Sequence, residues 1–262
     1  MKISIKNSEE IKKMRISGKL ASQVLEMITP YVVAGITTEH LDYICHNYIV
    51  EKQNAIPACL GYQGFPKSTC ISVNEVVCHG IPNNTELKHG DIVNIDVTII
   101  KNQYHADTSK MFIVGNTNSI AKKLCYTAKK ILYETFSVIK PNIPINIIGK
   151  TIQKNIHKTP FSIVTEYCGH GIGKEFHEDP YILHYFNKNN KILFKEGMVF
   201  TIEPIINSGK SDVICMDDSW TIKTKDNSLS AQYEHTILVT KNGCEILTKR
   251  KTENIKNIYI NM

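Results

Sequence analysis

Apolar residues recur at helical spacing near the start of the chain and then give way to strand-like sequence. Asn7 and Glu10 have the spacing of a capping box, and an apolar stripe follows over residues 11–28. After a glycine, Thr38 is placed to cap a second, shorter helix. β-branched strand-and-loop sequence then runs from about residue 55 to 115. This part therefore reads as two helices followed by strands.

The same order of elements occurs again in the second part of the chain. Asn118 or Ser119 opens a long amphipathic helix, which stops before Pro141. A shorter apolar stripe follows Pro144 and predicts another helix. Strand-like sequence resumes at Phe161. The second part is therefore also predicted to be two helices followed by strands.

This repeated order predicts an internal duplication, with halves at about 7–115 and 118–248. Asp96 and Glu203 occupy corresponding positions, 107 residues apart. We therefore expect a single α+β domain over residues 1–262, in which helices cover one face of a curved sheet. A site at the junction would receive side chains from both halves.

A predicted β-hairpin carries two acids. Lys101 and Asn102 separate two apolar-rich runs, and if they form the loop, Asp96 lies opposite Asp107. Opposed side chains on one face are about 5 Å apart. Two carboxylates at that distance repel unless a proton or a cation lies between them. A register shift of one residue would separate them, and two solvated surface charges are the alternative interpretation.

Two further acids lie in strand-like runs. Glu203 comes six residues after Gly197, as Asp96 comes six residues after Gly90. Glu234 lies in another β-branched run. An acid inside an apolar strand is costly unless it is paired or binds a metal. These repeated acids favour a cation site over isolated surface charges.

Three of the ten histidines have unusual surroundings. His79 precedes a Gly and is close to Pro82, which indicates a fixed turn. His170 lies among three glycines, which allow close approach of a ligand. His177 follows, and the glycines favour a loop or β-hairpin here over a helix. The others are interpreted as structural or surface residues: His40, His46, His89, His105, His157, His184 and His235.

Composition excludes several classes of protein. The formal net charge is +6, with Lys scattered along the chain, which favours a solvated basic surface; weak attraction to a ribosome or nucleic acid is the alternative. The eight cysteines form no Cys-x-x-Cys pair, which disfavours a zinc ribbon. No signal peptide and no apolar run of about 18 residues is present. We expect a cytoplasmic protein with reduced thiols, acting on neither DNA nor membranes.

Seven short segments together resemble the bacterial type I methionine aminopeptidases. They are VCHGIP at 77–82, NIDVT at 94–98, ADT at 106–108, GHGIG at 169–173, FHE at 176–178, TIEP at 201–204 and YEHT at 233–236. The resemblance spans most of the chain. It implies the pita-bread fold, a pseudo-twofold α+β architecture, and a monomer.

The resemblance also implies a dinuclear metal centre. Its ligands would be Asp96, Asp107, His170, Glu203 and Glu234, with Asp107 and Glu234 bridging two divalent cations. Oxygen ligands with a single nitrogen suit Mn²⁺, Fe²⁺ or Co²⁺, and Zn²⁺ remains open.

The implied reaction is hydrolytic removal of N-terminal methionine, preferring a small second residue, by a water that bridges the two metals. His79 and His177 would contact the substrate, and Glu203 would shuttle a proton. The methionine pocket would use six residues, each with core packing as an alternative role: Cys59, Tyr62, Phe65, Cys70, Phe176 and Trp220. Position 65 is Phe where the bacterial pattern often has Tyr, which removes a hydroxyl.

Other functions remain as alternatives. An Xaa-Pro aminopeptidase or prolidase would share the fold but usually carries a separate N-terminal domain. A non-catalytic pita-bread module, associated with the ribosome, would typically have lost metal ligands. A two-metal phosphoesterase lacks support because no phosphate-binding glycine loop follows a strand. Docking at the ribosome is compatible with removal of methionine from nascent chains.

Overall fold

The two N-terminal helices begin close to the predicted positions. In the computed structural model, which describes residues 3–253, α1 (Ser8–Ile28) has the full capping box: the Asn7 side chain accepts the Glu10 N–H, and the Glu10 carboxylate accepts the Asn7 N–H. Helix α2 (Thr38–Asn47) is capped by Thr37, whose hydroxyl accepts the His40 N–H. The predicted Thr38 cap was wrong by one residue, because Thr38 already has helical geometry and its hydroxyl donates to Asn83 O.

The second pair of helices also follows the prediction. Asn118 caps α3 (Ser119–Phe136) through a hydrogen bond from the Ala121 N–H, and α4 (Ile147–Ile156) comes after Pro144. Short turns complete the helical structure: the 3-10 turns η1 (Thr29–Tyr31) and η3 (Tyr62–Gly64), and the π-helical turn η2 (Tyr48–Lys52). Within residues 3–253, no helix is long and apolar enough to cross a membrane.

The strands pair in antiparallel fashion throughout the described residues. The first half contributes β1 (Ile56–Pro57), β2 (Cys70–Val73), β3 (Val76–Cys78), β4 (Ile92–Lys101) and β5 (Tyr104–Ile113). The second half contributes β6 (Ser162–Ile163), β7 (Gly169–Gly171), β8 (Glu178–Ile182), β9 (Val199–Ile202), β10 (Ile205–Asn207), β11 (Val213–Cys215), β12 (Ile222–Thr224), β13 (Ser230–Gln232), β14 (His235–Val239) and β15 (Cys244–Ile246).

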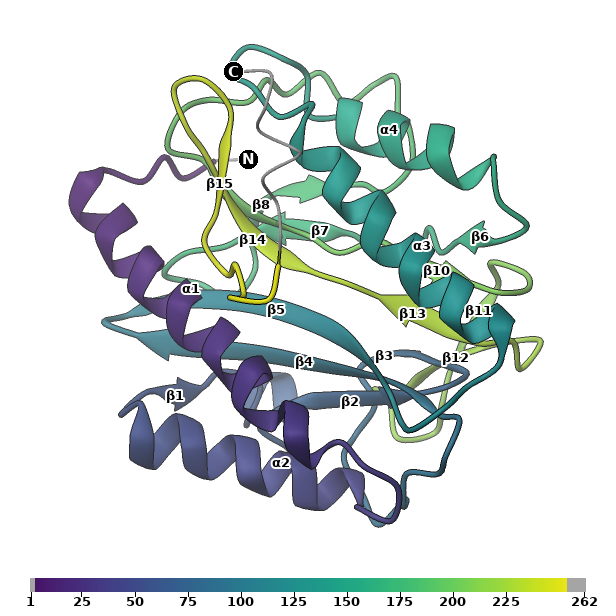
Figure 1. Cartoon of the computed structure of the whole chain (residues 1–262). Helices are drawn as coiled ribbons and strands as arrows, with labels where there is room; N and C mark the ends of the chain where they lie inside the picture. Colours follow the sequence, from purple (N-terminus) through teal and green to yellow (C-terminus); the bar gives the residue numbers. More distant parts are fainter. Residues whose placement is uncertain (1–2, 254–262) are drawn as a thin grey trace.

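Hydrogen bonding divides these strands into four sheets. In the first half, β4 pairs with β5 along one edge and with β1 and β2 along the other. In the second half, the order β15-β14-β9-β7-β8 forms a five-stranded sheet, and β13-β10-β6 forms a smaller one. Strand β3 joins β12 and β11, so this sheet takes strands from both halves. Figure 1 shows α1 and α2 beside β4 and β5, with α3 and α4 on the other side.

The predicted register of the β4–β5 hairpin was wrong. The loop is Asn102-Gln103, and both residues have positive φ (53° and 69°), as a two-residue hairpin turn of type I′ requires. Asp107 therefore lies opposite Thr98, and Asp96 opposite Ser109. The difference is an even number of residues, so both acids stay on one face, as diagonal neighbours.

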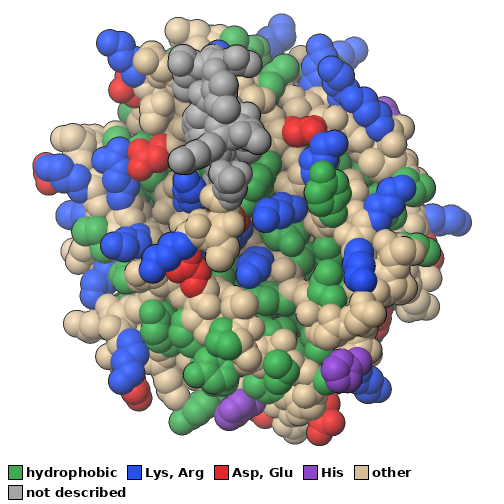
Figure 2. All heavy atoms as spheres, viewed as in Figure 1, with side chains coloured by type: hydrophobic (Ala, Val, Ile, Leu, Met, Phe, Trp, Pro, Cys, Tyr) green, Lys and Arg blue, Asp and Glu red, His purple; other side chains and the backbone are tan. Residues whose placement is uncertain are grey.

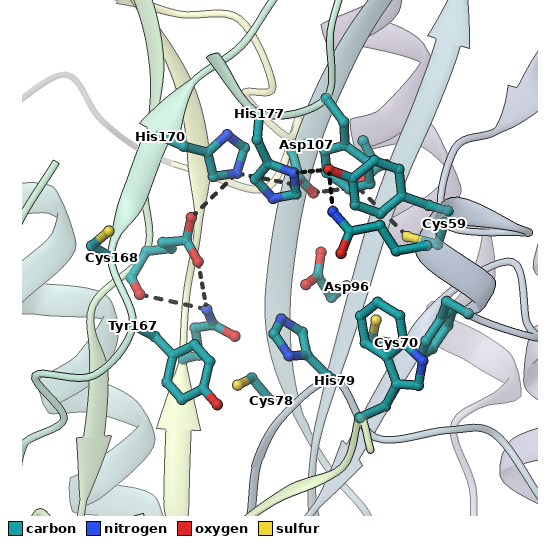
Figure 3. Close-up of a pocket in the computed structure, with 18 of the residues that line it drawn as sticks. Cys59, Cys70, Cys78, His79, Asp96, Asp107, Tyr167, Cys168, His170 and His177 are labelled. Carbon is teal, nitrogen blue, oxygen red and sulfur yellow. Dashed lines mark hydrogen bonds and ion pairs between the residues drawn. The ribbon is translucent and has the colours of Figure 1, made fainter. Parts of the chain in front are cut away.

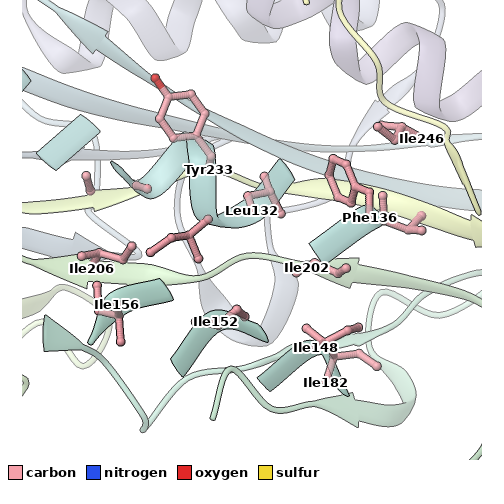
Figure 4. Packing of buried hydrophobic residues seen from close by; sticks show 14 of the residues in the cluster. Leu132, Phe136, Ile148, Ile152, Ile156, Ile182, Ile202, Ile206, Tyr233 and Ile246 are labelled. Atoms are coloured by element: carbon pink, nitrogen blue, oxygen red, sulfur yellow. The ribbon is translucent and has the colours of Figure 1, made fainter. Parts of the chain in front are cut away.

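Each half has its own apolar core. In the first, α1 and α2 pack on β4 and β5 through buried residues such as Leu25, Leu41 and Ile95. In the second, α3 and α4 pack on β9, β10 and β14, with Leu132 and Ile152 fully buried (Figure 4). Because the two cores are separate, the strands between them can carry polar side chains without interrupting either core.

Basic side chains are spread over the molecular surface in the view of Figure 2. Lys and Arg appear on all sides of this face, interspersed with hydrophobic and neutral groups. Several lie in exposed ion pairs, including Arg15 with Glu245 and Lys12 with Glu9. This distribution matches the solvated basic surface expected from the scattered lysines.

Candidate metal centre and substrate cavity

Five side chains from both halves converge where the sheets meet. They are Asp96 on β4, Asp107 on β5, His170 on β7, Glu203 directly after β9 and Glu234 directly before β14. We call this group the carboxylate centre. The ligand atoms of Asp107, His170 and Glu234 lie within 4.8 Å of one another. His170 Nε2 is 3.7 Å from Glu203 Oε1 and 3.9 Å from Asp107 Oδ2 (Figure 3).

The tautomer of His170 follows from its hydrogen bond. Its Nδ1 lies 3.0 Å from Gly171 O, which can only accept, so Nδ1 carries the proton. Burial and the neighbouring His177 lower the pKa of His170 to about 3, so the ring is neutral. The lone pair of Nε2 therefore faces carboxylate oxygens. Such an arrangement is repulsive by itself and is the geometry of a metal-ligating histidine.

Burial disfavours the ionised form of the carboxylates. Burial raises the pKa of Asp107 to about 6, and burial with the Asp107 charge raises the pKa of Glu203 to about 8. The same causes raise the pKa of Asp96 and of Glu234 well above their usual ranges. Asp96 Oδ1 and Glu234 Oε1 are buried and have no hydrogen-bond donor among the described residues. Divalent cations fit this donor set, because they would satisfy these oxygens and the His170 lone pair.

Three neighbouring side chains, missed in the sequence, orient the acids. Thr98 Oγ1 donates to Asp107 Oδ1 at 2.8 Å. Thr201 Oγ1 donates to Glu203 Oε1 at 2.7 Å and accepts the His170 N–H. Gln232 Nε2 donates to Glu203 Oε2 at 3.2 Å. Thr98 lies two residues after Asp96, and Thr201 lies two residues before Glu203; this period-2 spacing could have predicted that each threonine shares a face with an acid.

A buried histidine also contacts the backbone of this centre. His184 was interpreted as structural or surface-exposed, and the structure places it in the interior. Its Nε2 accepts the Glu203 N–H at 3.2 Å, and burial lowers its pKa to about 3. Its role in the structure is to fix the backbone of Glu203 after β9.

His79 directly follows β3 and lines the same cavity as the acids and His170. Its φ of 53° is uncommon for a residue other than Gly, and such strain concentrates at functional sites. The predicted turn is not formed, and residues 79–83 have irregular backbone; the backbone is closely packed at Gly80, where a Cβ would come within 2.3 Å of Ile71 O. The His79 ring meets Tyr167 and Trp220 edge-on, at 5.6 and 6.0 Å between centroids. Burial lowers the pKa of His79, so it is neutral near pH 7.

A cavity of about 400 Å³ adjoins the carboxylate centre. Its walls include all eight residues predicted to contact substrate: Cys59, Tyr62, Phe65, Cys70, His79, Phe176, His177 and Trp220. The apolar members also pack against one another, with Phe65 edge-on to Trp220 at 5.1 Å. Tyr167, Ile205, Gln232 and Gln63 line the cavity too and were not predicted. Their contact with the cavity depends on the tertiary fold.

Comparison with known proteins agrees with this geometry. The model of metallopeptidase family M24 matches residues 12–241. A methionine aminopeptidase of Buchnera aphidicola subsp. Schizaphis graminum is 60% identical, and the match covers 100% of both chains. A methionine aminopeptidase of Escherichia coli K12 is 57% identical, with 98% of each chain covered. The chain belongs to metallopeptidase family M24, among the methionine aminopeptidases. It is therefore a hydrolase whose family uses metal ions, and the carboxylate centre is its candidate metal site.

Solved structures of this family have the same fold. A methionine aminopeptidase from Rickettsia prowazekii superposes with a TM-score of 0.92 at 47% identity, covering 95% of this chain and 100% of the other. The pita-bread fold is thus confirmed. A prolidase from Pyrococcus horikoshii has a TM-score of 0.74 at 24% identity, and only 64% of that chain is covered. The prolidase shares the fold alone, so the rival assignment is not favoured.

Proposed function

We propose that this chain removes the N-terminal methionine from peptides and nascent proteins, using the carboxylate centre to hold two divalent cations. The observation that carries the proposal is the convergence, on one cavity, of unpaired buried carboxylate oxygens, a neutral His170 with a free lone pair, and an apolar pocket. These five side chains would hold the cations: Asp107 and Glu234 as ligands of both, Asp96 as a ligand of one, and His170 with Glu203 as ligands of the other. The metal is Co²⁺, Mn²⁺, Fe²⁺ or Zn²⁺.

The bound cations supply two kinds of chemistry: they lower the pKa of a water toward neutrality and polarise the substrate carbonyl. The protein provides the proton transfers. The Glu203 carboxylate takes a proton from the attacking water and delivers it to the leaving nitrogen. Gln232 and Thr201 hold this carboxylate by hydrogen bonds to separate oxygens, so its orientation does not change as the proton moves.

Two neutral histidines contact the substrate from opposite sides of the cavity. His79 hydrogen-bonds the scissile nitrogen, and His177 hydrogen-bonds a carbonyl oxygen, where negative charge develops. Both rings lie in the cavity wall, as Figure 3 shows. Burial lowers the pKa of each, so the histidines act as hydrogen-bonding groups rather than as fixed cations.

The apolar wall receives the methionine side chain. Cys59 and Cys70 are free thiols, and hydrogen bonding to Cys59 together with burial raises the pKa of Cys70, which keeps it uncharged. Neutral sulfur and the Phe65 and Trp220 rings suit a thioether. The free α-amine of the substrate lies at the carboxylate centre, so cleavage is limited to the start of a chain.

Release of methionine from Met-Ala-Ser tests the proposal. Metal-stripped protein receives Mn²⁺, Fe²⁺, Co²⁺ or Zn²⁺ under anaerobic conditions, with N-acetyl-Met-Ala-Ser and a Gly-Pro peptide as controls. We expect metal-dependent release from the free peptide alone. His79→Ala should slow release while both metals stay bound. Cleavage of the acetylated peptide, or metal loss in His79→Ala, would contradict the assigned roles.

The cellular setting is part of the same proposal. We propose that the protein acts as a monomer in the cytoplasm, near the ribosome exit where nascent N-termini appear. The scattered positive charge would support weak contact with ribosomal RNA. Co-sedimentation with ribosomes at low and high salt tests this, and no binding at low salt would refute it.

A further inference from the structure

The hydroxyl of Tyr62 joins His177 to a loop at the cavity wall. Tyr62 Oη lies 2.7 Å from His177 Nδ1, and Gln63 Nε2 lies 3.3 Å from the same hydroxyl. All three residues line the cavity. The sequence assigned Tyr62 only to the methionine pocket and did not identify Gln63. The hydrogen bonds indicate a different use of both residues.

The backbone of this loop is held in an unusual conformation. Gln63 has a φ of 47° and lies between Gly61 and Gly64, whose φ values are 82° and 87°. Three backbone hydrogen bonds close the loop, from Gly61 N to Phe65 O at 2.8 Å, from Phe65 N to Tyr62 O at 2.9 Å and from Gly64 N to Gly61 O at 3.2 Å. A non-glycine residue in this region of φ needs support from its surroundings. The consequence of the conformation is that the Gln63 amide reaches the Tyr62 hydroxyl.

The direction of the hydrogen bonds follows from donor and acceptor chemistry. The Gln63 amide nitrogen can only donate, so it occupies a lone pair of the Tyr62 oxygen. A phenol is a better proton donor than a neutral imidazole, and an imidazole nitrogen is a better acceptor than a phenol oxygen. The Tyr62–His177 separation of 2.7 Å is also typical of an O–H donor, whereas N–H donors lie near about 2.9–3.0 Å. Tyr62 therefore donates to His177 Nδ1.

The plane of the His177 ring is fixed independently of this hydrogen bond. The ring stacks on Phe176 at 4.5 Å with an interplanar angle of 10°, and Tyr62 contacts the same Phe176 ring at 4.7 Å. Stacking on Phe176 fixes the plane of the His177 ring, and the hydrogen bond with the Tyr62 hydroxyl places the Nδ1 edge of that ring toward the cavity wall. The second nitrogen, Nε2, is then the edge that faces the cavity interior (Figure 3).

We propose that Gln63 and Tyr62 are positioning residues that keep the proton of neutral His177 on Nε2, so that His177 donates a hydrogen bond to the substrate carbonyl oxygen. The contribution to catalysis rests on the proposed function, whereas the tautomer itself does not. Gln63 donates to Tyr62, Tyr62 donates to Nδ1, and Nε2–H is left for the oxygen on which negative charge develops.

The tautomer can be measured by ¹⁵N NMR of the imidazoles in the full chain loaded with Zn²⁺, which is diamagnetic. We expect the wild type to show a protonated Nε2 and an unprotonated Nδ1 at His177. Tyr62→Phe keeps the ring against Phe176 and removes the hydroxyl, so the two tautomers should mix. Gln63→Glu replaces a donor by an acceptor that draws the Tyr62 proton, so the tautomer should reverse to Nδ1–H.

Kinetics adds a second readout. Methionine release by Tyr62→Phe should lose about tenfold in kcat, the effect of one hydrogen bond, with KM little changed because the ring remains. Tyr104→Phe is the matched control: it removes a hydroxyl that donates to Glu10 outside the cavity, and it should change neither the tautomer nor kcat.

The outcomes separate this inference from the proposed function. A wild-type Nδ1–H tautomer, or an unchanged tautomer in both Tyr62→Phe and Gln63→Glu, would overturn the inference even if methionine is released. A wild type with Nε2–H that reverses in Gln63→Glu supports the assignment of the hydrogen bonds. If that same protein releases no methionine with any metal, the proposed function fails while the hydrogen-bond assignment stands.

Discussion

Two groups of buried polar side chains meet at the start of β14, and only one of them is satisfied by its own neighbours. Glu234 and His235 are consecutive, so their side chains point to opposite faces of the strand. Glu234 belongs to the carboxylate centre. His235 belongs to a second group with Arg250 and Glu253, which we call the arginine cluster.

The arginine cluster is internally complete. Arg250 Nε donates to Glu253 Oε1 at 2.7 Å, and Arg250 Nη2 lies 2.6 Å from the same oxygen. Arg250 Nη2 also donates to His235 Nε2 at 3.1 Å, which leaves Nδ1–H to donate to the Thr248 hydroxyl. Arg250 Nη1 donates to Thr108 Oγ1, which itself donates to Glu234 O. Positive and negative charge are thus balanced by short hydrogen bonds.

The two groups differ in what their charges face. In the arginine cluster a carboxylate faces a guanidinium, whereas in the carboxylate centre acids face one another and a histidine lone pair. A buried charge that is paired with an opposite charge of the same chain is part of the folded structure, and removing one of the two partners is destabilising. Buried charge without a partner costs folding energy and indicates a ligand from outside the chain. Burial alone would not have distinguished the two.

The largest effect is expected at the carboxylate centre. Glu234→Gln keeps the volume but removes one negative charge of the carboxylate centre, so metal content should fall and methionine release should drop at least about a thousandfold. The metal-free variant should be no less stable than metal-free wild type, because one of several repelling carboxylates has gone. Metal analysis, peptide assay and urea unfolding test this. Normal turnover by Glu234→Gln, or a clearly lower stability of this variant without metal, would show that the carboxylate centre does not differ from the arginine cluster in this way.

The same change in the arginine cluster should act in the opposite way. Glu253→Gln leaves Arg250 buried without a counter-charge, which should lower the free energy of unfolding by about 3–5 kcal/mol while metal binding persists. Glu245→Gln is the matched control, because its partner Arg15 is half exposed and such pairs contribute about 0–1 kcal/mol. Equal urea midpoints for the two variants would show that the arginine cluster is not a structural ion pair.

A smaller effect is expected from pH. Burial alone would raise the pKa of Glu253, but His235 and Arg250 outweigh burial and lower that pKa. The positive charge is on Arg250, because His235 Nε2 accepts a hydrogen bond from Arg250 Nη2. The unfolded chain has an ordinary glutamate pKa of about 4.3 and binds this proton first as pH falls. The stabilisation by Glu253 is therefore full above about pH 5 and shrinks below it. Urea unfolding of wild type and Glu253→Gln from pH 7 to 3 should show that the difference between their free energies of unfolding becomes smaller. A difference that stays constant would contradict this.

Local sequence patterns predicted the helices well and the strand pairing less well. The capping box at Asn7 and the cap at Asn118 depend on contacts within a few residues, and both are present. The register of the β4–β5 hairpin depended on which two residues adopt positive φ. The prediction used the polar pair Lys101-Asn102 between two apolar-rich runs, whereas Lys101 pairs with Tyr104 and Gln103 joins Asn102 at positive φ.

The alternation of side chains along strands protected the site prediction from this error. Because the register differed by an even number of residues, Asp96 and Asp107 remained on one face. The duplication into halves at about 7–115 and 118–248 and the extent of the domain stay predictions. The described structure is consistent with helices and strands that recur in the same order.

The sequence by itself determined the helices, the acids placed inside apolar strands, and the family, since these depend on local periodicity and on residue identity. The tertiary structure decided which of those acids lack a donor, which nitrogen of His170 and of His235 carries the proton, and that Gln63 reaches Tyr62. The reason is physical: these properties depend on contacts such as Asp107 with Thr236 or Tyr62 with His177, which join positions 129 and 115 residues apart. No local pattern encodes those distances, and the chemistry of the cavity depends on them.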